Sequence, residues 1–189
     1  MKPFLLILGG SIGVGKTTLA YSLAQNYGNT EIIENDTIRR ELLGFPLNYF
    51  MNHDLDNSFS TENNQRVDHE INHRTEQFLQ QGKNVIRAHV DVSEHDLLRY
   101  ASAYPDARLI CLYLLAPESI IRSRLQSRKQ ERDTLSSLSV AHGHASDADE
   151  NVLLKFPVQI HAPNGWTVLD ASLSRDDLLH EAEKIIANS

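Results

Sequence analysis

Strand-like runs alternate along the chain with segments in which apolar residues recur every three or four positions. The strand-like runs are Phe4–Leu8, Thr30–Ile33, Asn84–Val90, Arg108–Leu115 and Trp166–Leu169. The first run contains no polar residue, as expected of a central strand that is covered on both faces. We therefore predict β-strands at these positions.

Helical segments separate the predicted strands. They are Lys16–Asn26, Thr61–Gln81, Ser93–Ala103, Pro117–Arg128 and Ser174–Ala187. In the first of them, Leu19 and Leu23 are four residues apart, so both fall on one face of a helix. Strands that alternate with helices predict an α/β fold with a five-stranded parallel sheet and right-handed crossovers. A chain of 189 residues fits a single domain, residues 1–189.

Two polar segments interrupt the alternation. Gly44–Ser60 mixes aromatic residues with asparagines, and Lys129–Asp149 is rich in Ser, His, Asp and Arg. Loops of this length inside one domain are usually functional elements or disordered. We expect the first segment, with the helix after it, to form an acceptor-side insertion (about 44–81), and the second to form a mobile lid (about 129–149).

The most specific motif lies between the first strand and the first helix. Residues 10–17 read GSIGVGKT and fit the P-loop pattern G-x-x-x-x-G-K-[ST], in which backbone N–H groups at a helix N-terminus surround phosphate oxygens. Lys16 would reach the β- and γ-phosphates of a nucleotide, and the Thr17 hydroxyl would ligate Mg²⁺. A chance glycine-rich turn is the alternative, and the flanking strand and helix argue against it. The predicted nucleotide-binding residues are Gly10, Ser11, Gly13, Val14, Gly15, Lys16, Thr17 and Thr18.

A second polar cluster follows the second strand and contains Glu34, Asp36 and Arg39. In an open parallel sheet, the carboxyl end of a strand beside the first one faces the same crevice as the P-loop. A carboxylate there can accept the proton of an acceptor hydroxyl, and the arginine can hold a charged group. Alternatively, Asp36 caps a short helix that runs to Leu43, with Arg39 and Arg40 in solvent. The two interpretations can coexist.

These motifs resemble those of P-loop kinases of small molecules, such as shikimate and gluconate kinases, zeta-type toxins and antibiotic phosphotransferases. The closest resemblance is to the AAA-type predicted kinases, through residues 36–44 (DTIRRELLG) and 145–149 (ASDAD). It implies a P-loop three-layer sandwich and transfer of the γ-phosphate of ATP to a hydroxyl of a small molecule. Asp36 would be the base, Arg39 the substrate clamp, and Glu34 would lie near Mg²⁺, through water.

Arginines gather at the end of one predicted helix and the start of the lid, at Arg122, Arg124, Arg128 and Arg132. Phosphoryl transfer spreads negative charge over the migrating group, so an arginine brought in by a lid lowers the barrier. The resemblance points to Arg128 and Arg132 for this role. For Arg122 and Arg124, the alternative is a solvated helix face or pairing with a neighbouring glutamate such as Glu118. By analogy alone, residues 170–172 would lie beside the base of the nucleotide.

The third strand departs from the family pattern. Related kinases usually read V-I-x-D-A-T there, whereas residues 85–91 read VIRAHVD, so Arg87 or Ala88 stands at the acidic position. The missing carboxylate would help to hold Mg²⁺ through water. Glu34 or Asp91 can replace it, or the metal is held less firmly. This departure favours an alternative function, a nucleotide-dependent regulatory or binding module with weak ATPase activity.

A competing motif occurs at His69–His73, which reads HEINH and fits the zinc pattern H-E-x-x-H. Its helix is polar, whereas a zinc-binding helix needs a buried supporting shell. We therefore expect a solvated helix face. His142 and His144, in the predicted lid, are also expected in solvent.

Charge and cysteine content narrow the range of partners. The formal charge of −7 weighs against a nucleic-acid binder and makes a polynucleotide 5′-hydroxyl kinase the less favoured alternative. Cys111 is the single cysteine and lies in an apolar run, which suits a buried thiol in a reducing compartment. The apolar run at Phe4–Leu8 is shorter than that of a secretory signal. We expect a cytoplasmic protein that uses ATP, Mg²⁺ and a small-molecule acceptor, without nucleic-acid or membrane partners.

Overall fold

The computed structural model describes residues 2–46, 49, 51, 57–90, 92–134, 153 and 157–189. Its strands are β1 (Phe4–Gly10), β2 (Thr30–Ile33), β3 (Asn84–Ala88), β4 (Arg108–Leu115) and β5 (Thr167–Asp170). They form one five-stranded sheet in the order β2-β3-β1-β4-β5, and every pair is parallel. The predicted parallel sheet is confirmed, although β3 ends two residues before the predicted Val90.

Helices follow each strand. They are α1 (Lys16–Asn26), α2 (Asn35–Leu43), α3 (Thr61–Gln80), α4 (Glu94–Ala103), α5 (Glu118–Thr134) and α7 (Arg175–Asn188), and a 3-10 turn, η1 (Asn57–Phe59), precedes α3. Helix α5 continues to Thr134, six residues beyond the predicted end at Arg128, so the first part of the predicted lid is helical. This extension contains neither glycine nor proline, and its Lys, Gln, Glu and Arg residues favour helix. The rest of that segment, residues 135–149, lies outside the described residues.

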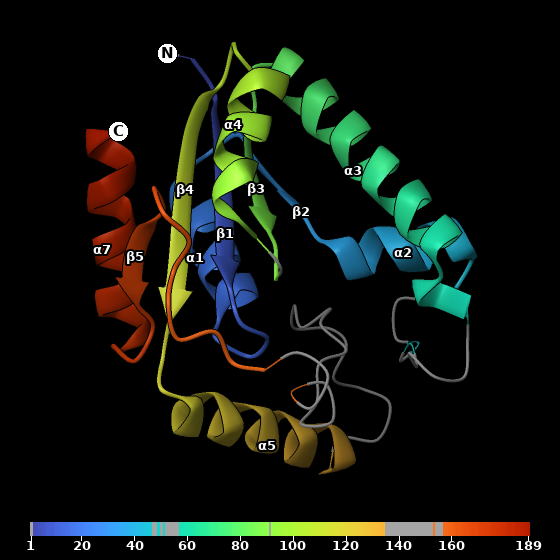
Figure 1. The fold of residues 1–189 in the computed structure, drawn as a ribbon, viewed down its shortest axis with the longest axis vertical. Coiled ribbons are helices and arrows are strands. Elements are labelled where there is room, and N and C mark those ends of the chain that lie inside the picture. The colour runs from blue at the N-terminus through green and yellow to red at the C-terminus, as the bar shows by residue number, and fades with distance from the viewer. Residues whose placement is uncertain are drawn as a thin grey trace.

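Alternate residues of β1 pack against two separate hydrophobic clusters. Leu6 and Leu8 join a cluster with Leu23 of α1 and Ile186 of α7. Leu5 and Ile7 join the other cluster, which contains apolar residues of α2, α3 and α4. Helices therefore cover both faces of the sheet, which confirms the three-layer arrangement. Figure 1 shows α3 and α4 on one side and α5 across the end where the strands finish.

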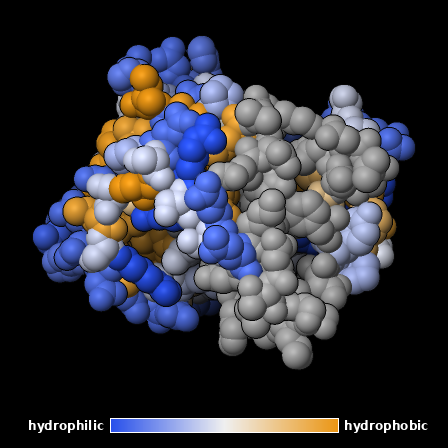
Figure 2. Space-filling view, turned by 90° about the horizontal axis from the view of Figure 1, so that it is seen from below, coloured by the Kyte–Doolittle hydropathy of each residue, from blue (hydrophilic) through white to orange (hydrophobic). Residues whose placement is uncertain are grey.

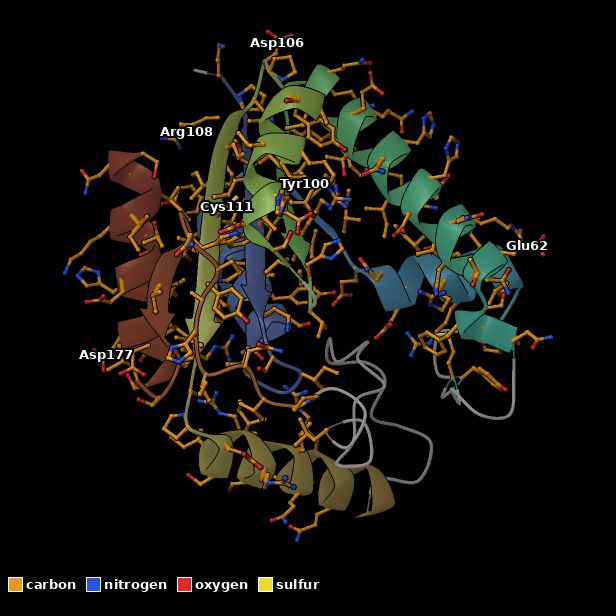
Figure 3. The ribbon with its side chains drawn as sticks, viewed as in Figure 1. Glu62, Tyr100, Asp106, Arg108, Cys111 and Asp177 are labelled. Atoms are coloured by element: carbon orange, nitrogen blue, oxygen red, sulfur yellow. The ribbon has the colours of Figure 1, made fainter. Side chains whose placement is uncertain are left out.

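The thiol of Cys111 lies in the sheet, on strand β4 (Figure 3), and is 8% exposed. Burial raises its pKa to about 12, so the group stays a thiol at neutral pH. The predicted buried thiol is therefore confirmed. Among the helices in the described ranges, none combines the length and apolar character that a membrane span requires.

The position of the P-loop follows from the strand order. β1 lies between β3 and β4, and the chain leaves its carboxyl end directly into residues 11–15. Ligands of open parallel sheets bind at such a point, where neighbouring connections run to opposite sides. Seen from this end (Figure 2), the described surface intersperses hydrophilic residues with small apolar patches.

Candidate active site

The P-loop holds a backbone shape that only glycine adopts without strain. Gly10 has φ 133°, and a Cβ there would lie 2.6 Å from the carbonyl oxygen of Leu114 in β4. Gly15 is the N-cap residue of α1, has φ 117° and has no side chain that could cap the helix. The N-terminus of α1 favours an anion, because its free N–H groups and the helix dipole are positive there. All residues of α1 are described, and none in its first turn is acidic and could supply that negative charge.

Lys16 folds back over the P-loop. Its ammonium donates to the carbonyl oxygens of Gly10 at 2.7 Å and Ser11 at 2.9 Å, and the residue is 8% exposed. Burial and, to a lesser extent, the charge of Arg128 lower the pKa of Lys16 to about 7, and the carboxylate of Asp36 opposes this shift. An incoming phosphate would supply the negative charge that this buried cation needs.

Helix α5 packs directly on the P-loop. A Cβ at Gly13 would lie 3.0 Å from the Leu125 side chain. The guanidinium of Arg124 donates to the carbonyl oxygens of Val14 at 2.7 Å and Ala171 at 2.9 Å, so it joins the P-loop to the loop after β5. A solvated or glutamate-paired Arg124 was therefore the wrong expectation.

Other contacts complete the surroundings of the P-loop. Arg122 does form the expected pair with Glu118, with Nε and Oε1 2.7 Å apart. The backbone N–H of Gln159 donates to the Ser11 hydroxyl at 2.8 Å, which brings the segment before β5 against the P-loop.

Glu34, not Asp36, occupies the N-cap position of α2, so the prediction that Asp36 caps this helix is wrong. Burial raises the pKa of the Glu34 carboxyl, while hydrogen bonds from Tyr21 at 3.1 Å and Thr37 at 3.3 Å act against this rise. Asp36 lies in the first turn of α2, where a carboxylate favours the helix dipole.

The charge of Asp36 acts both on the P-loop and on α2. Its charge raises the pKa of Lys16 in the P-loop and that of Arg39 in α2, although burial dominates and lowers both. The structure thus brings together the predicted base, the predicted clamp and the P-loop lysine.

Arg39 and Arg40 are buried, at 7% and 3% exposure, so the alternative in which both arginines lie in solvent is wrong. Arg39 donates to the carbonyl oxygen of Ser58 at 2.7 Å and lies 4.5 Å from the centre of the Phe59 ring. Arg40 donates to the carbonyl oxygen of Tyr49 at 2.9 Å. Both arginines therefore attach α2 to the acceptor-side insertion.

The lid prediction is only partly covered by the structure. Arg128 lies in α5, close enough to influence the charge of Lys16. Arg132 belongs to the same helix, but its side chain lies outside the described residues, as do Asp91, His142, His144 and residues 145–149.

The end of β3 is basic rather than acidic. Arg87 pairs in register with Ile7 of β1 and is 4% exposed, and the backbone N–H of His89 donates to the carbonyl oxygen of Leu8 at 2.8 Å. Burial and, to a lesser extent, the charges of Arg87 and Arg99 together lower the pKa of His89 to about 4. The sequence signal was an arginine inside an apolar run, but its contacts could not be read from the run.

The zinc motif is a solvated helix face, as expected. His69 and His73 are exposed, and Glu70 pairs with Arg74 at 2.7 Å. Among the described residues, no three His, Cys, Asp or Glu side chains gather as a metal site. Mg²⁺ needs no such cage, because it is commonly bound through one or two protein oxygens, water and substrate phosphates. Thr17 and Glu34 carry side-chain oxygens of that kind.

Comparison with known proteins places this geometry in a wider context. Residues 5–156 match the family model described as AAA domain. No curated protein matches the chain.

Several solved structures are similar over nearly the whole chain. A sugar kinase from Janibacter sp. has a TM-score of 0.59 and 18% identity, covering 98% of this chain and 95% of that one. A gluconokinase from Sinorhizobium meliloti has a TM-score of 0.58 and 17% identity, covering 99% of this chain and 93% of that one. A shikimate kinase from Bacteroides thetaiotaomicron has a TM-score of 0.57 and 16% identity, covering 97% of this chain and 98% of that one. At these identities the likeness shows a shared fold, that of the P-loop kinases.

Proposed function

We propose that this chain, which belongs to the AAA domain family, is an ATP-dependent kinase that transfers the γ-phosphate to a hydroxyl of a small molecule. The observation that carries the proposal is the position of Asp36, whose charge reaches both Lys16 of the P-loop and Arg39 of the acceptor side. A carboxylate between a phosphate site and an acceptor site is where a base for phosphoryl transfer is needed.

The P-loop would hold the triphosphate. Backbone N–H groups of residues 10–18 surround the phosphates, and Lys16 leaves its two carbonyl partners for the β- and γ-oxygens. Thr17 and Glu34, the latter through water, are the residues that would hold Mg²⁺. The ion supplies neutralising charge at the phosphates when it is bound.

The acceptor would bind between α2 and the P-loop. Asp36 orients the acceptor hydroxyl and takes its proton as the oxygen attacks the γ-phosphorus, while Arg39 holds a charged group of the acceptor. Arg128 and Arg132 of α5 would stabilise the negative charge of the migrating group. The proximity of Arg128 to Lys16 supports this role for Arg128.

We predict that Asp36→Asn lowers transfer by about 10²- to 10⁴-fold and leaves ATP binding unchanged, because a general base contributes only to the chemical step. The measurement is ADP formation with a panel of sugars, gluconate and shikimate, alongside ATP titration by calorimetry. Asp176→Asn, an exposed change on α7, is the matched control and should behave as wild type. If transfer and binding both survive in Asp36→Asn, Asp36 is not the base.

A second candidate function is a nucleotide-dependent regulatory or binding module with weak ATPase activity. The observation that favours it is the basic end of β3, where Arg87 and His89 stand and related kinases carry an aspartate. A phosphorylated product in the acceptor panel would rule it out, whereas slow hydrolysis alone would support it.

We also propose a cytoplasmic protein with a small-molecule partner and no nucleic-acid or membrane partner. The formal charge of −7 and the buried Cys111 thiol support this. Oligonucleotide binding that weakens with salt would argue instead for a polynucleotide kinase.

A further inference from the structure

We infer that the acceptor carries an acidic group, a carboxylate or a phosphate, and that Arg87 of β3 binds it. That this anion belongs to a phosphoryl acceptor rests on the proposed kinase function. The anion site itself rests on the contacts of Arg87, and it can be tested without phosphoryl transfer.

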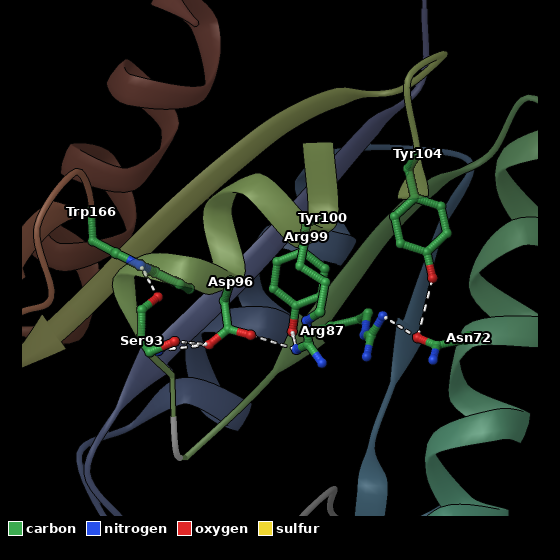
Figure 4. A network of polar contacts seen from close by, with 8 residues as sticks. All are labelled: Asn72, Arg87, Ser93, Asp96, Arg99, Tyr100, Tyr104 and Trp166. Carbon is green, nitrogen blue, oxygen red and sulfur yellow. Dashed lines mark hydrogen bonds and ion pairs between the residues drawn. The ribbon is translucent and has the colours of Figure 1, made fainter. Parts of the chain in front are cut away.

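Arg87 is a buried cation whose described neighbours are neutral. It is 4% exposed, and one terminal nitrogen donates to Asn72 Oδ1 at 3.2 Å (Figure 4). Its guanidinium lies 5.3 Å from the centre of the Tyr100 ring. Its Nε has no hydrogen-bond partner among the described residues. Burying a charge in this way is unfavourable unless a counter-charge and hydrogen bonds compensate for the lost water.

The carboxylate of Asp96, in the same polar network as Arg87 (Figure 4), is already engaged elsewhere. One oxygen of Asp96 accepts from the Ser93 backbone at 2.6 Å and the Ser93 hydroxyl at 2.9 Å. Its other oxygen pairs with Arg99 at 2.6 Å. Asp96 therefore neutralises Arg99 and caps α4, which leaves Arg87 without an anion in the described part of the chain (Figure 4).

The charges at this end of β3 are predominantly positive. Arg87, Arg99 and Lys16 all lower the pKa of His89, whereas among the residues that the structure describes Asp96 raises it. His89 Nε2 is also buried without a partner among the described residues. An anion that entered here would meet the guanidinium of Arg87 and the charge of Lys16. It would also meet Nε2 of His89, the second nitrogen here without a partner among the described residues.

The neutral partner of Arg87 is placed so that a ligand can replace it. Asn72 is exposed on α3, and its Oδ1 also accepts from the Tyr104 hydroxyl at 3.2 Å, so this single amide oxygen serves two donors. Val90, three residues beyond Arg87, is 37% exposed. A carboxylate or phosphate approaching from this surface can take the place of the amide and bind the guanidinium in bidentate fashion.

Helix α3 links this site to the predicted clamp. Asp68, one turn before Asn72, influences the charge of Arg39. Arg39 and Arg87 thus lie against the same helix, on the side of the sheet where the acceptor would bind. Arg39 lies in the field of two carboxylates, Asp36 and Asp68, whereas the described side-chain contacts of Arg87 are with the neutral Asn72 and Tyr100. The acidic group is therefore assigned to Arg87, and the group that Arg39 would hold is a separate part of the acceptor.

The test compares anion binding in wild type, Arg87→Met and Arg99→Met, without nucleotide. The probes are acetate for a carboxylate and inorganic phosphate for a phosphate ester, and all phosphate titrations use a Lys16→Met background that weakens the P-loop site. The readouts are melting temperature and the chemical shifts of a ¹⁵N-labelled arginine side chain. Arg99 is the matched control, because its exposed charge already has a carboxylate partner.

We expect one of the two anions to stabilise wild type and Arg99→Met, and to bind Arg87→Met about 10- to 100-fold more weakly, as loss of charged hydrogen bonds predicts. Whichever anion binds identifies the acidic group. Arg87→Met should melt no lower than wild type, because an apolar side chain replaces an uncompensated cation. If Arg87→Met fails to fold, Arg87→Lys serves instead, and its weaker binding of the anion is the expected result.

Equal anion binding by wild type and Arg87→Met, or none by wild type, overturns the inference. Transfer assays with matched pairs, gluconate against sorbitol and glycerol 3-phosphate against glycerol, separate it from the kinase proposal. Transfer to the acidic and the neutral member of a pair at equal rates, unaffected by Arg87→Met, keeps the kinase and removes the anion site. Arg87-dependent anion binding without any transfer keeps the anion site and removes the kinase.

Discussion

At the scale of single residues, Lys16 is held in a state that nucleotide binding must change. Its ammonium is buried against two backbone carbonyls, and burial lowers its pKa to about 7. In the unfolded chain the pKa of lysine is about 10.4. The unfolded state therefore binds more protons than the folded state between these two values, and the lysine contribution to stability rises with pH across this window.

We predict that the free energy of unfolding of wild type, relative to Lys16→Met, rises by on the order of 2 kcal/mol between pH 7 and 9. Urea denaturation of both proteins at several pH values measures this difference. Saturating ATP should remove the pH dependence, because phosphate oxygens favour the charged ammonium. Parallel stability curves for the two proteins without ATP would show that the pKa of Lys16 is not lowered.

Residues differ in how far their roles could be predicted. The P-loop could be predicted from the sequence, because phosphate binding requires glycines, lysine and threonine at a fixed spacing. The contacts of Arg124 and Arg87 depend on which backbone carbonyls and side chains other elements bring near. Those partners are distant in sequence, so no local pattern specifies them.

At the scale of elements, α5 is part of the P-loop structure. Arg124 joins the carbonyl oxygens of Val14 and Ala171, which belong to the P-loop and to the loop after β5. The predicted boundaries of most helices were close, because apolar spacing and caps are local signals. The end of α5 was not, since its polar residues were interpreted as loop although they favour helix.

We predict that Arg124→Met destabilises the protein by about 1–3 kcal/mol, because two backbone carbonyls lose a charged donor, and that it weakens ATP binding. Arg122→Met, which removes only an exposed pair with Glu118, should change stability by less than about 1 kcal/mol. Urea denaturation and ATP titration of both variants test this. Equal effects of the two substitutions would contradict a connecting role for Arg124.

At the scale of the whole molecule, the central strand carries both the core and the site. β1 supplies residues to both hydrophobic clusters and ends at Gly10, whose backbone lies against Leu114 of β4. Fold and nucleotide site are therefore coupled at this position.

We predict that Gly10→Ala destabilises the protein by about 1–3 kcal/mol, because φ 133° strains a residue with a side chain and its Cβ would meet the Leu114 carbonyl. ATP affinity should fall with it. Gly28→Ala is the matched control, since a Cβ there meets nothing within 4 Å, and it should be neutral or slightly stabilising. Thermal melts with and without ATP measure both effects, and a fully stable Gly10→Ala protein would refute the coupling.

The strand order has a consequence for how such proteins diversify. Arg39 and Arg87 are attached to α2, α3 and β3 on one side of β1, whereas Arg124 ties the P-loop to α5 and the β5 loop on the other. Mutations that alter acceptor preference can therefore accumulate on one side without loss of the donor site. For the proposed kinase, a change of acceptor would then need substitutions only on the surfaces of α2, α3 and β3, while the donor site stays the same.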